Sequence, residues 1–291
     1  MIRIQNLTFA YEADRPPALQ ALNLVINEGE YIALIGPNGC GKTTLIRHLN
    51  ALLLPSTGEV WVDDFNTRGA KGLQEIRSRV GMVFQNPDNQ IIGMSVEEDV
   101  AFGPGNLGLP SGEVRRRVDQ ALATVGLTGL EKRSPHTLSG GQKQLLAIAG
   151  LLAMDPKFIV LDEPTSSLDP AGKRNVLALL QKLQGQGMGI IHVTHNIDEA
   201  ALADRVLVMD KGELIADGNP ADILSRVEWL KSLGLAPPRI TELMWQLQQV
   251  GEDVDSSIFT IEGAVNEISA LLTELRNSTH DYMSRKVGGH V

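Results

Sequence analysis

A glycine-rich segment near the N-terminus carries residue types that bind phosphate. It reads Gly36-Pro37-Asn38-Gly39-Cys40-Gly41-Lys42-Thr43, and Thr44 follows it. The glycines let the backbone turn tightly and aim several N–H groups inward, while the next helix directs its positive end at the phosphates. By this geometry Lys42 reaches the β- and γ-phosphates, Thr43 places its hydroxyl on Mg²⁺, and Thr44 hydrogen-bonds a neighbouring phosphate oxygen. The segment predicts a nucleotide site, and a chance glycine-rich turn is the alternative.

Two adjacent carboxylates follow an apolar run later in the chain. Residues 158–161 predict a buried strand, and Asp162 and Glu163 come directly after it. Ligands usually bind at the carboxyl edge of a parallel sheet. Asp162 would hold Mg²⁺, and Glu163 would polarise the attacking water as the catalytic base. Alternatively, both acids cap a helix beginning near Thr165 or Ser166, but the phosphate loop makes this interpretation the weaker one.

The elements around these groups follow the order strand, loop, helix. Residues 31–35 predict a short buried strand that enters the glycine loop, and apolar residues recur at helical spacing from Leu45 to Leu53. Before them, alternation over 2–9 and 22–26 predicts two antiparallel strands. A hairpin is expected around Ser56-Thr57-Gly58.

Further along, residues 95–150 read as mainly helical, and then strand and helix patterns alternate, with strands at 158–161, 189–193 and 205–209 and a helix at 176–183. This order is typical of a mainly parallel sheet with helical crossovers. We therefore expect an α/β fold with a P-loop NTPase core, an N-terminal antiparallel β layer and a helical subdomain inserted at about 86–155. The core domain would span 1–230, and a small helical extension 231–291.

Composition limits the partners and the compartment. The formal net charge is -9, which disfavours a nucleic acid as partner. The single cysteine, Cys40, and the lack of a long apolar N-terminal run fit the cytoplasm. No apolar run approaches the ~20 residues needed to cross a bilayer. If the chain serves a membrane, another protein spans it.

The pentapeptide Leu138-Ser139-Gly140-Gly141-Gln142 narrows the family. With the phosphate loop and the paired acids, it makes the chain resemble an ATP-binding-cassette (ABC) ATPase from about Ile2 to Gly218. The resemblance implies that residues 139–142 bind the γ-phosphate held by a second subunit, and that Asp169 belongs to the loop linking the two sites. ATP would then close a head-to-tail dimer. Leu145 departs from the family pattern, which usually has arginine there.

The same resemblance assigns roles to three further residues. Tyr11 would stack on adenine, Gln85 would sense Mg²⁺ and the attacking water, and His195 would contact the γ-phosphate. Thr43, Gln85 and Asp162 would then surround the Mg²⁺ that accompanies ATP. Plain packing in the β layer is the alternative for Tyr11, and an ordinary surface histidine is the alternative for His195.

Two segments resemble one branch of this family, the energy-coupling factor transporters. They read Phe84-Gln85-Asn86-Pro87-Asp88-Asn89-Gln90 and Val96-Glu97-Glu98-Asp99-Val100-Ala101-Phe102-Gly103. In that branch the region builds a groove for a coupling helix of the transmembrane T subunit. The resemblance therefore implies that Asn89 and Gln90 bind a partner, whereas a solvated turn is the alternative.

The end of the chain resembles the same branch, through residues 234–238 and 241–243. Two apolar stripes at helical spacing follow, formed by Leu243, Met244, Leu247 and Val250 and by Val265, Ile268, Leu271, Leu272 and Leu275. We expect them to contact a partner ATPase, and docking on the chain's own core is the alternative. Residues 277–291 are expected to fray.

Together these patterns favour an energy-coupling factor ATPase on the cytoplasmic face of the cell membrane. It would pair with itself or a sibling, bind a T subunit, and drive uptake of a vitamin or transition-metal ion through a substrate-binding S component. The ATPase of a conventional ABC importer is the alternative. A soluble ABC ATPase acting on DNA or ribosomes is disfavoured, because the chain lacks a second phosphate loop and a long insertion. The signature pentapeptide contradicts a P-loop kinase.

Overall fold

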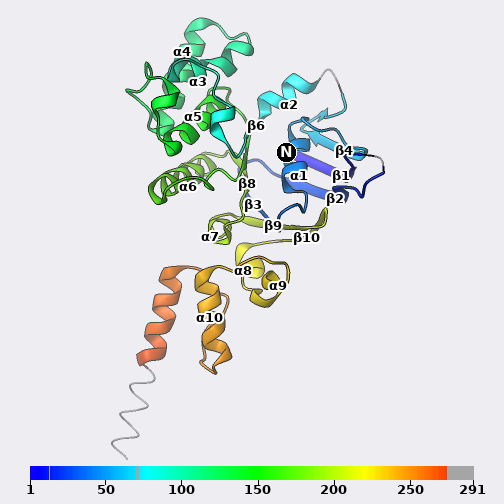
Figure 1. The fold of residues 1–291 in the computed structure, drawn as a ribbon, viewed down its shortest axis with the longest axis vertical. Coiled ribbons are helices and arrows are strands. Elements are labelled where there is room, and N and C mark those ends of the chain that lie inside the picture. Colours follow the sequence, from blue (N-terminus) through cyan, green and yellow to red (C-terminus); the bar gives the residue numbers. More distant parts are fainter. Residues whose placement is uncertain (13, 70–71, 274–291) are drawn as a thin grey trace, which may run out of the picture. The chain divides into compact units, whose positions relative to one another are not determined.

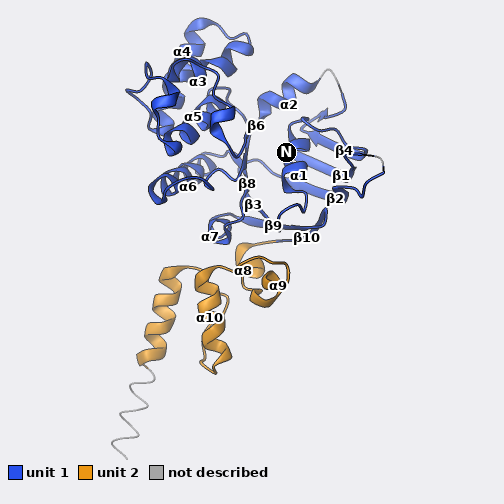
Figure 2. Ribbon diagram, viewed as in Figure 1, with its two compact units in different colours: residues 1–217 blue, residues 218–291 orange. Residues whose placement is uncertain are grey.

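The computed structural model describes residues 1–12, 14–69 and 72–273. They fall into two compact units that divide after Asp217 (Figure 2). Helices α8 (Pro220–Leu224) and α9 (Val227–Ser232) therefore group with the C-terminal part of the chain. The expected boundary at residue 230 had placed most of them with the ATPase core.

An antiparallel four-stranded sheet opens the first unit (Figure 1). Its strand order is β2-β1-β4-β5, and its bounds are β1 Ile2–Phe9, β2 Leu19–Ile26, β4 Thr57–Val62 and β5 Phe65–Asn66. Ile2 pairs with Ile26 across β1 and β2, and the inward-facing residues of both strands are buried. The alternating pattern read from the sequence is thus confirmed.

The hairpin expected around Ser56-Thr57-Gly58 is wrong. These residues enter β4, and the tight connection is instead Asp63-Asp64, between the paired residues Val62 and Phe65. Gly58 has a φ of 80° because β1 bulges toward it: a Cβ on Gly58 would lie 2.1 Å from the Asn6 carbonyl oxygen. The glycine marks a close approach of two strands and not a turn.

A six-stranded sheet forms the centre of the unit, in the order β10-β9-β3-β8-β7-β6. Its strands are β3 Tyr31–Ile35, β6 Val80–Val83, β7 Phe158–Asp162, β8 Gly189–Val193, β9 Arg205–Asp210 and β10 Glu213–Gly218. The pairs β9-β3, β3-β8, β8-β7 and β7-β6 are all parallel. Every residue of β3, β6, β7 and β8 is buried, which explains why these strands are mainly apolar; Asp162 at the end of β7 and His192 in β8 are the polar or charged exceptions.

One core joins both sheets through helix α1 (Lys42–Leu49). Leu45, Ile46 and Leu49 belong to the same buried cluster as residues of β1, β3 and β7. The helix ends at Leu49, so the helical spacing read as far as Leu53 overran it, and Leu52 is exposed. Helices α6 (Pro170–Gly185) and α7 (Ile197–Ala200) precede and follow β8. Because α1 is anchored in this core, it holds the phosphate loop, whose last two residues, Lys42 and Thr43, are the first residues of the helix.

The expected helical subdomain is present between β6 and β7. Helices α3 (Val96–Asn106), α4 (Ser111–Val125) and α5 (Gly140–Leu152) lie together in Figure 1. Ser95 starts α3 with a capping box closed by Glu98, so two terminal backbone donors are satisfied. Helix α2 (Leu73–Arg79) leads into β6, and short 3₁₀ turns occupy Pro87–Asn89 and Pro135–Thr137.

The second unit is helical, with α8 and α9 followed by α10 (Arg239–Gln249) and a helix over 261–273. The apolar stripes split. Met244, Leu247, Ile268 and Leu271 join a small core with Val254 and Ala264, whereas Leu243, Val250, Val265 and Leu272 are exposed. Two residues of each stripe therefore pack inside this unit, Met244 fully buried and the others partly buried. Leu275 and residues 277–291 lie outside the described residues.

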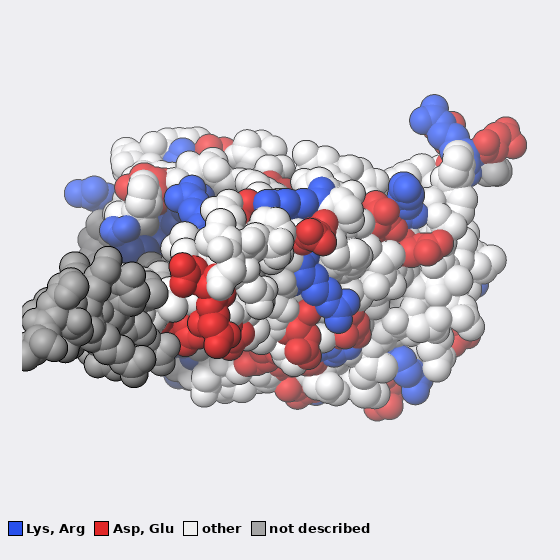
Figure 3. Space-filling view, turned by 90° about the horizontal axis from the view of Figure 1, so that it is seen from below, with Lys and Arg blue, Asp and Glu red and all other residues white. Residues whose placement is uncertain are grey.

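The surface carries mixed charge. On the face shown in Figure 3, acidic and basic side chains are interspersed. Within the described residues, none of the helices has the length and apolar character required to cross a membrane.

Replacing Gly58 with alanine should destabilise the chain. The new Cβ must push Asn6 away or strain a left-handed backbone, so we expect a loss of roughly 2–4 kcal/mol in the free energy of unfolding. Thermal unfolding of the full chain measures it. Gly150→Ala in helix α5 is the matched control, because a Cβ there meets nothing within 4 Å, and it should be neutral or slightly stabilising. Equal melting temperatures for the two variants would refute the close approach.

Candidate functional site

The sequence-predicted site residues converge at one edge of the six-stranded sheet. The phosphate loop follows β3, His195 follows β8, Asp162 ends β7 with Glu163 directly after it, and Gln85 follows β6. These strands are neighbours in the order β3-β8-β7-β6 and run parallel, so their carboxyl ends open onto the same edge. This is where open α/β sheets bind their ligands.

The phosphate loop wraps around the Lys42 side chain. Lys42 is buried, and its Nζ donates to the carbonyl oxygens of Gly36 at 2.7 Å and Pro37 at 3.0 Å. Gly36 has a φ of 151°, and a Cβ there would lie 2.2 Å from the Met209 carbonyl oxygen, so only glycine fits. Cys40 is buried within the loop. A pocket of ≈ 340 Å³ opens beside it, lined by Tyr11, Ala18, Asn38, Gly39, Gly41, Lys42, Thr43, Thr44 and Glu163.

Asp162 and Thr43, the last residue of the loop, together offer oxygen atoms that could bind a cation. The Thr43 hydroxyl donates to Asp162 Oδ2 at 2.9 Å. Burial raises the pKa of Asp162, and the neighbouring Glu163 carboxylate adds to the effect, while the Thr43 hydrogen bond opposes it. A divalent cation would favour the ionised carboxylate, and Mg²⁺ prefers hard oxygen ligands such as these. The donor set therefore fits Mg²⁺.

The three residues predicted to be catalytic meet at one carboxylate oxygen. Glu163 Oε2 accepts from Gln85 Nε2 at 2.9 Å and lies 3.3 Å from His195 Nδ1. Glu163 has a φ of 50°, uncommon for a residue other than glycine, and its backbone N–H donates to the Val193 carbonyl at 2.9 Å. This conformation aims a carboxylate from the end of β7 at the residues that follow β6 and β8. Such a group can orient and deprotonate water.

Tyr11 lies at the mouth of the pocket with 59% of its surface exposed. Its hydroxyl is 3.0 Å from Thr44 Oγ1, and its ring meets Phe9 edge to face at 4.9 Å between centroids. Its exposed ring remains a surface on which a base could stack. The expected adenine contact stays a prediction.

The signature segment lies at a helix N-terminus. Ser139 caps α5: its Oγ accepts from the Gln142 backbone N–H at 3.3 Å, and the Gln142 side chain accepts from the Ser139 N–H at 3.0 Å. Asp169 caps α6 with one hydrogen bond, since its Oδ1 accepts from the Gly172 backbone N–H at 3.0 Å. The two helix starts lie side by side, since a Cβ on Gly141 would be 3.3 Å from Gly172 Cα. Ser139, Gly140 and Asp169 are exposed, so a second subunit can reach them.

Because α6 begins at Pro170, the alternative in which Asp162 and Glu163 cap a helix near Thr165 is wrong. Leu145 is half-buried within an unbroken α5, so its departure from the family pattern does not interrupt the helix.

Gln90 contacts its own loop. Its side chain accepts from the Phe84 N–H at 3.2 Å and donates to the carbonyl oxygens of Phe84 at 3.1 Å and Asn86 at 3.3 Å. Gln90 thus braces the turn that carries Gln85, and Asn89 lies in the same turn. An ion pair of 2.6 Å between Asp88 and Lys143 ties this turn to helix α5. Partner binding by Asn89 and Gln90 stays a prediction.

Sequence reasoning missed Glu199, an acid buried next to the loops of Glu163 and His195. Its proximity to His195 in sequence was visible, but the pattern could not indicate that Glu199 turns inward.

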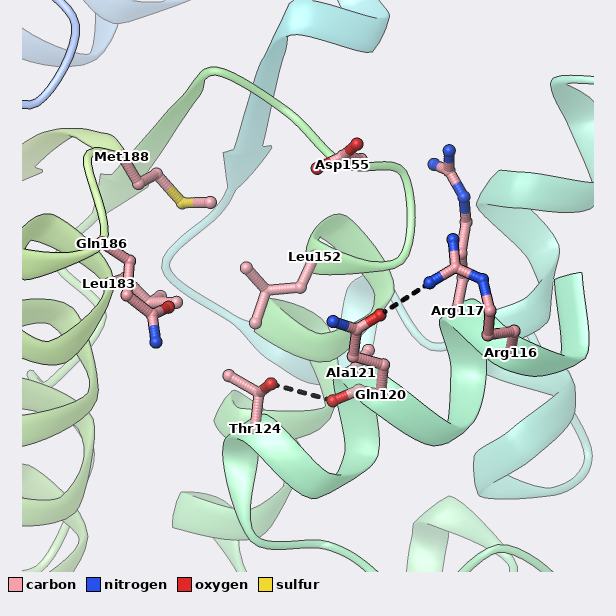
Figure 4. A pocket seen from close by; sticks show the side chains of 10 residues that line it. All are labelled: Arg116, Arg117, Gln120, Ala121, Thr124, Leu152, Asp155, Leu183, Gln186 and Met188. Carbon is pink, nitrogen blue, oxygen red and sulfur yellow. Dashed lines mark hydrogen bonds between the residues drawn. The ribbon is translucent and has the colours of Figure 1, made fainter. Parts of the chain in front are cut away.

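A separate pocket of ≈ 310 Å³ lies away from the sheet edge (Figure 4). Arg116 and Arg117 come from α4, whereas Leu183 is from α6 and Gln186 follows it. Both arginines pair with Glu113, and Arg116 also donates to Gln120 at 3.1 Å. Both guanidinium groups are thus engaged with the same Glu113 carboxylate, and the pocket holds none of the phosphate-binding groups.

Comparison with known proteins agrees with this geometry. A family model described as ABC transporter matches residues 19–166. A cobalt import ATP-binding protein, CbiO of Syntrophus aciditrophicus, is 51% identical over 93% of this chain and 96% of its own length. An energy-coupling factor transporter ATP-binding protein, EcfA1 of Caldanaerobacter subterraneus, is 51% identical over 92% of this chain and 98% of its own.

Solved structures agree too. CbiO1 of Clostridium perfringens, part of the ABC transporter complex cbiONQ, gives a TM-score of 0.73 at 41% identity, over 84% of this chain and 98% of that one. A dimeric ATP-binding cassette in a post-hydrolysis state, bound to ADP and Pi, gives a TM-score of 0.68 at 32% identity. The match covers 76% of this chain and 99% of that chain. The predicted fold and nucleotide-binding activity are confirmed, and the chain belongs to the ABC ATPases, in the branch of energy-coupling factor transporter ATP-binding subunits.

Proposed function

We propose that ATP hydrolysis by this chain drives uptake of a vitamin or transition-metal ion through an energy-coupling factor transporter. The observation that carries the proposal is the extent of the match: relatives of this branch align over 92–93% of the chain, beyond the ATPase core. One of them is named for cobalt import, which favours a metal ion without excluding a vitamin. In this role the chain lies on the cytoplasmic face of the membrane, and other subunits span it.

A groove in the first unit supports binding of a transmembrane T subunit. It measures ≈ 670 Å³ and is lined by Leu73, Gln74, Arg77, Ser78, Phe102, Gly103, Asn106, Leu107 and Met154. Phe102, half exposed, offers an aromatic anchor of the kind that dominates binding interfaces. Its position in the segment 96–103, which resembles the branch, fits a groove for an amphipathic coupling helix of that subunit.

The groove is connected to the catalytic residues by a short stretch of chain. Helix α2, which forms one wall, passes directly into β6, and β6 ends two residues before Gln85. Gln85 donates to Glu163. A helix seated in the groove would therefore move the residue that positions the catalytic base, which gives transport and hydrolysis a physical coupling.

Within the site, we assign Glu163 as the base, Gln85 and His195 as its positioning partners near the γ-phosphate, and Thr43, Asp162 and Gln85 as the surroundings of Mg²⁺. Bound Mg²⁺ would supply charge neutralisation at the phosphates. The exposed N-termini of α5 and α6 would complete the ATP site of a second ATPase subunit, because backbone N–H groups at a helix N-terminus bind anions such as the γ-phosphate. That second subunit would be another copy of this chain or a homologue.

Replacing Glu163 with glutamine should stop turnover and spare ATP binding. The amide keeps the hydrogen-bonding shape but cannot take a proton, so kcat should fall by about 10²–10⁴-fold. Phosphate release measures turnover, and gel filtration with ATP tests whether the dimer still closes. Glu213→Gln, the same change on an exposed strand residue, is the control. Turnover at the wild-type rate in Glu163→Gln would rule out the base assignment.

Replacing Phe102 with glutamate should release the membrane subunits, because a charge would have to be buried against the apolar helix. The tagged chain is isolated from native membranes in mild detergent, and co-purifying proteins are identified by mass spectrometry. Leu54→Glu is the matched control, since Leu54 is 49% exposed against 50% for Phe102 and does not line the groove.

The wild-type chain and the Leu54 variant should retain a T-type membrane protein and small S components, and the Phe102 variant should lose them. Retention of the T subunit by all three proteins would contradict its binding in the groove. A conventional permease, ribosomes or DNA-repair proteins in place of a T subunit would contradict the transporter.

A further inference from the structure

We infer that Glu199 is a positioning residue for hydrolysis: its buried carboxylate ties the loop after Glu163 to the loop that carries His195. Glu199 lies in the single-turn helix α7, and only 3% of its surface is exposed. A carboxylate in such a place is costly unless several donors compensate it. The inference rests on the catalytic roles proposed for Glu163 and His195 and is independent of the transported solute.

Four hydrogen bonds from three side chains compensate the carboxylate. The Thr165 hydroxyl lies 2.8 Å from both carboxylate oxygens, the Thr194 hydroxyl donates at 3.0 Å, and the Asn196 amide donates at 3.1 Å. Thr165 and Thr194 are themselves buried. Hydrogen bonds to an ionised acceptor are stronger than neutral ones, so this cluster is rigid.

The donors flank the catalytic residues. Thr165 is two positions after Glu163, and Thr194 immediately precedes His195. Both loops are therefore held by one anion, beside the point where Glu163 Oε2 and His195 Nδ1 lie 3.3 Å apart. The Glu163 N–H also donates to the Val193 carbonyl. Reacting groups need such support, because a misplacement of about 1 Å can cost roughly 100-fold in rate.

A second layer supports Glu199 from the sheet. His192 Nε2 lies 3.4 Å from Glu199 Oε2, an alignment too poor for a hydrogen bond, and His192 Nδ1 is 3.0 Å from the Tyr31 hydroxyl. Complete burial lowers the pKa of His192, with the Glu199 charge opposing the shift, so the ring is neutral. The neutral ring can accept a hydrogen bond from the Tyr31 hydroxyl at Nδ1.

Kinetics of the full chain test the inference. Glu199→Gln keeps the shape but replaces one acceptor oxygen with a donor, so either the Thr194 hydroxyl or the Asn196 amide loses its acceptor. We expect kcat to fall about 10–100-fold and the KM for ATP to change less than about 2-fold, because the phosphate loop is untouched. Rates are divided by the measured concentration of ATP-binding sites, so that misfolded protein does not lower the apparent kcat. Glu30→Gln is the control, since that carboxylate pairs with Arg205 at 3.0 Å and has no contact with these loops.

Thr165 gives a second pair of variants that does not depend on how well Glu199→Gln folds. Thr165→Ser retains the hydroxyl and should keep near wild-type kcat, whereas Thr165→Val should lower it. The double variant of Glu199→Gln with Thr165→Val should be no slower than Glu199→Gln alone, because both remove the same link.

Equal kcat for Thr165→Ser and Thr165→Val, or an effect of Glu199→Gln on KM alone, would overturn the inference. If Glu163→Gln instead retains turnover, the catalytic assignment itself fails, which is a separate result.

Discussion

The contact between Glu163 and its two neighbours depends on the parallel pairing of four strands. Gln85, Glu163 and His195 follow β6, β7 and β8, and the phosphate loop follows β3. Parallel pairing with matched register brings these four chain positions to a common edge. Helix α1 and the N-terminal sheet share one buried core with that sheet, which supports the edge.

Environment gives three acids near this edge different properties. Asp162 is buried with one hydroxyl donor, so burial raises its pKa, and a bound cation would favour its ionised form. Glu163 is partly exposed and contacts Gln85 and His195, as suits the proposed role of a group that orients water. Glu199 is buried and fully bonded, so it can act only by holding others. Carboxylates in one site commonly divide their tasks in this way.

The sequence predicted those features that depend on local chemistry. Buried strands appear as unbroken apolar runs, as in residues 158–161, and the phosphate loop is recognisable because glycine and lysine spacing follows from phosphate geometry. The sequence did not predict features that depend on contacts between residues far apart in the chain. Gly58 looks like a turn residue, but its role is set by a bulge at Asn6; Glu199 looks like any surface acid. For Gln90, the sequence did not indicate the hydrogen bonds that its side chain makes within its own loop, and its predicted partner contact stays a prediction.

In the proposed dimer two subunits share each ATP site, because the phosphate loop opens into one pocket while Ser139 lies exposed at the start of α5. The most direct test mixes two forms of the chain, Ser139→Arg and Glu163→Gln, each expected to be inactive alone, with active wild-type chain as reference. A mixed head-to-tail dimer retains one intact site, with Glu163 from one subunit and Ser139 from the other. Mixing the two inactive forms is expected to restore ATP turnover. A mixture no more active than its components would contradict a site shared between subunits.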